Sequence, residues 1–133
     1  MDTGREDDRN GRTFFAGEPP YQVTGRLLRC GVDIAALITG GTRPHIGAAA
    51  LAEPRASLAG DGHRSASASV LCRSGHKDDL WAREAALALA AVAGVPTVVT
   101  VGIHVDEADG EAIARLRQNF EAVLERLKKA AAG

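Results

Sequence analysis

Three histidines stand in three separate short turns, and each lies within two residues of a glycine. The segments are Pro44-His45-Ile46-Gly47, Gly75-His76-Lys77-Asp78-Asp79 and Gly102-Ile103-His104-Val105-Asp106. Each adjoins an apolar, strand-like run, and strand ends are where a rigid sheet can aim polar groups at one place. We therefore expect a functional site if these turns meet at one edge of a sheet. If they lie far apart in the fold, we expect the protein to have no small-molecule chemistry of its own.

The turn that contains His76 and Lys77 directly precedes a predicted helix. Free N–H groups at a helix N-terminus, together with a nearby lysine, favour binding of a phosphate or a carboxylate. The alternative is a capped helix in which Asp78 or Asp79 accepts from the first-turn N–H groups and the neighbouring side chains are only solvated.

The other two turns offer different chemistry. Gly40 and Gly41 permit close approach of a ligand to the backbone, and Arg43 can add an anion contact. The pair His104 and Asp106 can bind a metal, or the carboxylate can fix the tautomer of the imidazole.

A metal site would use His45, His76 and His104, as in catalytic zinc centres that keep one position open. No local spacing supports such a site, because the three residues are far apart in the sequence. The chain also lacks the phosphate-loop and nucleophile-elbow motifs.

The pattern of apolar residues predicts the elements that position these turns. Strands are expected over residues 21–28, 32–39, 46–52 and 65–72, then a helix that begins after Asp78 or Asp79 and runs to about Ala93. A strand over 96–101 and a final helix after Asp109 follow. Leu80, Glu84, Leu87 and Ala91 repeat at helical spacing in the first helix. We predict an α+β fold, in which a four-strand antiparallel meander is followed by helix, strand and helix, with both helices on one face.

Composition limits the possible functions. The chain has 133 residues, enough for one domain, which we expect over residues 13–133 after a disordered tail at 1–12. The net charge of -1 argues against nucleic acid or an anionic membrane as partner. No apolar run approaches the roughly 20 residues that would span a bilayer. Cys30 and Cys72 are expected as small core residues in a reducing, cytoplasmic compartment.

Several segments, taken in order, form one pattern: Gly31-x-Asp33, Gly40-Gly41-x-x-Pro44-His45-Ile46-Gly47, a serine-rich strand, Gly75-His76-Lys77-Asp78-Asp79, Gly102-Ile103-His104-Val105-Asp106 and Asn119. This pattern resembles the prenylated-flavin chaperone family of LpdD-like domains. The resemblance implies a fold similar to that of proteasome-assembly chaperones, a dimer, and service to a UbiD-like decarboxylase that uses prenylated FMN.

Three hypotheses follow. The first is a non-enzymatic, cytoplasmic chaperone that binds or delivers prenylated FMN to a decarboxylase, or matures that enzyme. The second is a small metal-dependent lyase or decarboxylase subunit that uses a divalent metal, and the third is a purely structural assembly chaperone. The residues expected to bind the cofactor are Arg43, His45, His76, Lys77, Asp78, His104 and Asp106.

Overall fold

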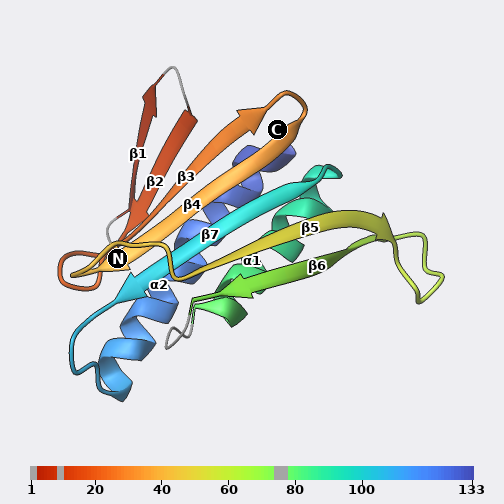
Figure 1. The fold of residues 1–133 in the computed structure, drawn as a ribbon. Coiled ribbons are helices and arrows are strands. Elements are labelled where there is room, and N and C mark those ends of the chain that lie inside the picture. Colours follow the sequence, from red (N-terminus) through yellow and green to blue (C-terminus); the bar gives the residue numbers. More distant parts are fainter. Residues whose placement is uncertain (1–2, 9–10, 74–77) are drawn as a thin grey trace.

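The protein is an α+β domain, as predicted, in which one sheet carries two helices (Figure 1). The structure, a computed structural model, describes residues 3–8, 11–73 and 78–133. In chain order the elements are β1 (Thr3–Asp8), β2 (Gly11–Ala16), β3 (Val23–Cys30), β4 (Asp33–Gly41), β5 (Ala48–Ala56), β6 (Arg64–Cys72), α1 (Asp79–Ala93), β7 (Thr97–His104) and α2 (Gly110–Ala132).

The sheet has seven strands in the order β1-β2-β3-β4-β7-β5-β6, so the predicted four-strand meander is wrong. Strand β7 lies between β4 and β5, parallel to β4 and antiparallel to β5. A central position suits β7, because Thr97, Val99 and Val101 are fully buried and β-branched. The sheet also begins earlier than expected, since β1 and the start of β2 precede residue 13.

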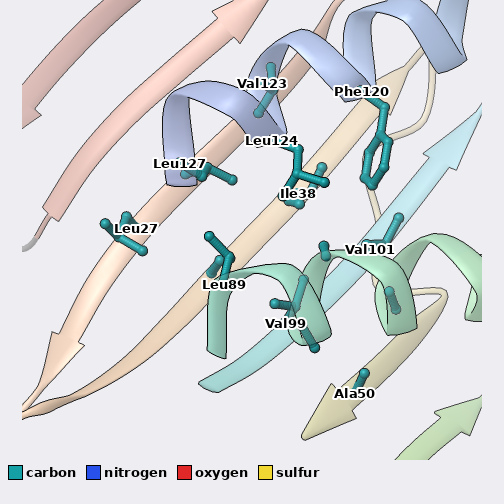
Figure 2. Close-up of a cluster of buried hydrophobic side chains, with 14 of the residues drawn as sticks. Leu27, Ile38, Ala50, Leu89, Val99, Val101, Phe120, Val123, Leu124 and Leu127 are labelled. Atoms are coloured by element: carbon teal, nitrogen blue, oxygen red, sulfur yellow. The ribbon is translucent and has the colours of Figure 1, made fainter. Parts of the chain in front are cut away.

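Helices α1 and α2 cover the same face of the sheet, and the hydrophobic core fills the space between the two layers (Figures 1 and 2). Alternate strand residues point into this core, as the pleat of a β-strand requires. The strands contribute Leu27, Ile38, Ala50, Val99 and Val101, and the helices contribute Leu89, Phe120, Val123, Leu124 and Leu127.

Helix α1 presents mainly alanines to the sheet. Its buried residues are Ala82, Ala85, Ala86, Leu89 and Ala90. Leu80, one of the residues that repeat at helical spacing in the sequence, is exposed. The sequence pattern indicated a helix but did not identify its buried face, because alanine gives a weak hydrophobic signal. Alanine nevertheless lets a helix approach a sheet closely.

The ends of α2 and α1 agree with their sequence signals at two positions. The Asp109 side chain accepts from the backbone N–H of Ala112 at 2.9 Å, which caps the start of α2. Gly94 adopts a left-handed conformation (φ 69°) immediately after α1, where a side chain would be strained.

The two cysteines do not lie in the core, contrary to prediction. Cys30 ends β3 and Cys72 ends β6, and both residues are exposed and outside any disulfide. The strand-like segments were recognised, but the alternation of β3 places Cys30 on the face away from the core, and Cys72 is the exposed last residue of β6. Within the described residues, no helix is long and apolar enough to cross a membrane.

Candidate functional site

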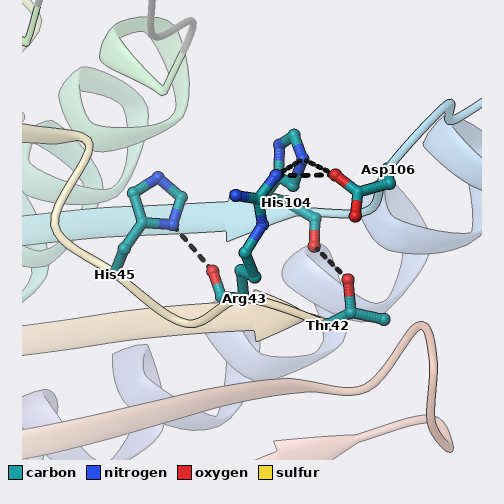
Figure 3. A network of polar contacts seen from close by, with 5 residues as sticks. All are labelled: Thr42, Arg43, His45, His104 and Asp106. Atoms are coloured by element: carbon teal, nitrogen blue, oxygen red, sulfur yellow. Dashed lines mark hydrogen bonds and ion pairs between the residues drawn. The ribbon is translucent and has the colours of Figure 1, made fainter.

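The ends of β4 and β7 bring two of the three predicted turns together. Because these strands are parallel, their carboxyl ends meet at the same sheet edge, where Gly41 pairs with His104. The backbone N–H groups of Thr42 and Arg43 donate to the carbonyl oxygen of His104 over 2.8 and 3.4 Å. The loop after β4 is thereby fastened to the end of β7 (Figure 3).

Arg43, His104 and Asp106 form a closed triangle of polar contacts, which we call the edge network (Figure 3). Arg43 Nη2 lies 2.6 Å from Asp106 Oδ1 and 2.8 Å from His104 Nε2. His104 Nε2 also lies 2.8 Å from Asp106 Oδ1. A guanidinium only donates, so a neutral His104 can accept from Arg43, whereas a ring that is protonated at Nε2 donates to Asp106.

The edge network lowers the pKa of the Asp106 carboxyl below its ordinary value of 3.8. The hydrogen bond from His104 is the largest cause, and the hydrogen bond and positive charge of Arg43 follow. A carboxyl whose folded pKa is lowered contributes stability above its unfolded pKa and loses it as the pH falls through the folded pKa. This contribution is small, because the carboxylate is fully exposed to water.

Replacing His104 with alanine is therefore expected to raise the pKa of Asp106 towards 3.8. The measurement is an NMR titration of the Asp106 carboxyl carbon. His63→Ala is the matched control, because His63 lies in the β5–β6 loop, away from the edge network. An unchanged Asp106 pKa in His104→Ala would show that the imidazole does not stabilise the carboxylate.

His45 and Asp78 form a second, more buried pair beside the edge network. His45 Nδ1 lies 2.8 Å from the carbonyl oxygen of Arg43, so Nδ1 carries the proton and donates. On the other side of the ring, His45 Nε2 lies 3.4 Å from Asp78 Oδ2. Protonation of Nε2 would convert this contact into an ion pair.

Asp78 occupies the N-cap position of α1, but its side chain does not cap the helix, contrary to one of our expectations. Its Oδ1 accepts instead from the backbone N–H of Ile103 at 3.2 Å, and the residue is buried. A Cβ on Gly47 would overlap the Asp78 carboxylate. Asp78 therefore joins the start of α1 to the end of β7 and to the loop before β5.

The described part of the predicted site is contiguous, because Arg43 belongs to both groups. Its side chain contacts His104 and Asp106, while its carbonyl accepts from His45, which in turn faces Asp78. His76 and Lys77 lie outside the described residues. The sequence did not single out Thr42, whose Oγ1 lies 3.4 Å from the carbonyl oxygen of His104; its place after two glycines was the available signal.

The donor set for a metal is incomplete in the residues that the structure describes. Ranges 3–8, 11–73 and 78–133 contain no group of three or more histidine, cysteine, aspartate or glutamate side chains arranged to hold an ion. Of the three histidines expected as ligands, only His45 and His104 fall within these ranges.

The fold and this edge define a two-layer α+β domain with a polar cluster where two parallel strands end. A family model described as the prenylated flavin chaperone LpdD-like domain matches residues 17–132, nearly the whole chain, and the chain belongs to that family. This agrees with the resemblance found in the glycine–histidine turns. The comparison with curated proteins found no match.

Proposed function

We propose that this protein binds prenylated FMN at the edge network and holds it for a partner enzyme. Membership of a prenylated flavin chaperone family supports the choice of ligand. The observation that supports the location is the exposed Arg43 guanidinium, held at the sheet edge between His104 and Asp106.

The residues at this edge offer contacts for both parts of a phosphorylated flavin, the phosphate and the ring system. The Arg43 side chain is 65% exposed and that of His104 is 42% exposed, so both can reach an anion in solvent. Asp106 holds the guanidinium in place but would repel a phosphate, so the phosphate would approach on the side away from this carboxylate. Ile46, in the same loop, is 57% exposed and offers an apolar contact for the ring.

The chain's own residues would bind and orient the cofactor, and the decarboxylation chemistry that the cofactor supplies belongs to the partner. We propose a UbiD-like decarboxylase as that partner, in the cytoplasm, from the resemblance in the turns. In this assignment Asp78 positions His45 and is not a direct ligand, because its carboxylate is buried and already accepts from Ile103.

Arg43→Ala is expected to weaken binding of FMN and of prenylated FMN about 10- to 100-fold, because it removes a charge-assisted hydrogen bond to the phosphate. Binding is measured by titration calorimetry, or by quenching of flavin fluorescence, with the full chain at tens of micromolar. Arg83→Ala is the control, since Arg83 is an exposed arginine on α1 and its loss changes the net charge equally.

Two results would contradict this proposal. Failure of the wild-type chain to bind either flavin at tens of micromolar removes the cofactor role. Equal affinities of Arg43→Ala and wild type place the cofactor elsewhere on the protein. If, in addition, His104→Ala still activates the partner decarboxylase fully, the histidine shapes the turn and the protein is a structural assembly chaperone.

A further inference from the structure

A cavity of about 470 Å³ lies between the loop that joins β2 to β3 and the first half of α2. Residues 17–21 of the loop line one side, and Arg115, Gln118 and Asn119 of α2 line the other. A cavity of this size can take a ligand as large as a short peptide. The residues of the edge network do not line it, so it is a separate candidate site.

The loop that walls this cavity is held by its own hydrogen bonds and by α2. The N–H of Tyr21 donates to the carbonyl oxygen of Glu18 at 2.8 Å. Gln22 Nε2 donates to the carbonyl oxygen of Gly17 at 3.3 Å. From the helix, Asn119 Nδ2 donates to the carbonyl oxygen of Tyr21 at 2.7 Å. A Cβ on Gly17 would overlap the Asn119 amide, so glycine leaves room for this contact. The cavity therefore exists before a ligand arrives, which lowers the entropic cost of binding.

The side chain of Asn119 offers the cavity a hydrogen-bond acceptor. Asn119 is only 7% exposed, and the carbonyl oxygen of Tyr21 takes its Nδ2. A carbonyl only accepts, so this contact fixes which end of the amide is Oδ1. Within the described residues no group donates to Oδ1, and this oxygen remains accessible where Asn119 lines the cavity. A ligand that brings an N–H to Oδ1 therefore completes the hydrogen bonding of a largely buried amide.

Arg115 supplies a positive charge to the same cavity. Its guanidinium lies over the ring of Tyr21, 5.3 Å from the centroid, and its Nη2 donates to Glu111 at 2.9 Å. Glu111 takes one nitrogen of the guanidinium, so the others can donate to a carboxylate. The side chains of Arg115 and Glu111 are 56% and 73% exposed, and an exposed ion pair of this kind contributes little free energy. A ligand carboxylate can therefore share Arg115 with Glu111.

We infer that this cavity binds the carboxyl terminus of a partner protein. A chain end carries the three features that the lining complements: a carboxylate for Arg115, a backbone N–H for Asn119 Oδ1, and a side chain for the apolar wall. That wall consists of the rings of Pro20 and Tyr21. Pro20, Arg115 and Gln118 are exposed, so the cavity opens to solvent and lets the rest of the partner chain leave it.

A partner held here would lie close to the edge network. The N–H of Gly41 donates to the carbonyl oxygen of Gln22 at 3.1 Å, and Gly41 pairs with His104. The loop of the cavity thus adjoins the end of β4, which itself adjoins the end of β7. The inference does not depend on flavin binding, because the peptide is titrated without a cofactor.

The test titrates the full chain, labelled with ¹⁵N, with the peptide acetyl-Lys-Ala-Leu. The leucine suits the apolar wall, and the lysine suits the carboxylate of Glu18 at the rim. The acid form is expected to shift the NMR signals of the Tyr21 N–H and the Asn119 side-chain amide, with a Kd of about 1 mM or tighter. The same peptide with a carboxamide end is expected to bind at least about tenfold more weakly. Acetate provides a carboxylate without the backbone N–H or the side chain, and it is expected to cause no comparable shift.

Two exposed arginines provide matched variants that should both fold. Arg115→Gln is expected to weaken binding of the acid peptide at least about tenfold, and Arg83→Gln on α1 is expected to leave it unchanged, although both lose one charge. Absence of shifts at Tyr21 and Asn119 with about 5 mM peptide overturns the inference. Equal affinities of the acid and the carboxamide also overturn it, as does equal binding of acetate. An Arg115→Gln chain that binds the peptide as wild type does would equally exclude this site.

Discussion

Replacing Gly102 with alanine is expected to destabilise the protein by about 3 kcal/mol and to disrupt the candidate site. A Cβ at this position would overlap the backbone carbonyl of His45. The glycine is needed here for space, because the loop crosses β7 at this residue. The same loop is held by the hydrogen bond from the N–H of Gly47 to the carbonyl of Val101, at 2.9 Å, so it cannot move away freely.

The matched control for this substitution is Gly110→Ala. Gly110 is the first residue of α2, and a Cβ there would meet no atom within 4 Å. Alanine at this position is expected to be neutral or slightly stabilising, because it restricts the unfolded chain. Urea unfolding measures the free energies, and flavin titration reports the site. Equal unfolding midpoints for Gly102→Ala and wild type would mean that the loop does not rest on β7.

The sequence predicted the elements better than their arrangement. Alternation and β-branching identified β3 to β7, and the position of Asp109 identified the start of α2. The meander was wrong because local patterns do not reveal which strands pair. The insertion of β7 between β4 and β5 depends on burying Val99 and Val101 in the core beneath α1, which is a tertiary effect.

For the candidate site, too, the sequence predicted which residues belong to it better than it predicted the role of each. Glycines beside histidines marked turns that the fold brings together, and the contacts among Arg43, His45 and His104 follow from the parallel pairing of β4 with β7. The role of Asp78 was not accessible from sequence. Its position favoured a helix cap. The N–H of Ile103 has no partner in β5, which begins opposite Val101, so this N–H donates to the Asp78 carboxylate instead.

Phe120→Ala is expected to cause the largest loss of stability, about 3–5 kcal/mol, because Phe120 is fully buried where α1, α2 and the sheet meet. Its ring stacks on Trp81 with 5.0 Å between centroids. The guanidinium of Arg117 lies 5.2 Å from the same ring and pairs with Glu84 of α1. Removal of the ring would leave a cavity and also loosen this junction between the helices.

Trp81 supplies the readout for this substitution, because it is the only tryptophan in the chain. Loss of the Phe120 ring is expected to shift Trp81 emission to the red and to lower the midpoint of urea unfolding. Ile113→Ala, on the exposed side of the same helix, should change the free energy of unfolding by no more than about 0.5 kcal/mol. If the two variants unfold at the same urea concentration, the packing of α2 against α1 through Phe120 is not what stabilises the helical layer. The pairing of β4 with β7, which brings Arg43 to His104, would then depend on the sheet's own hydrogen bonds and not on the helices that cover it.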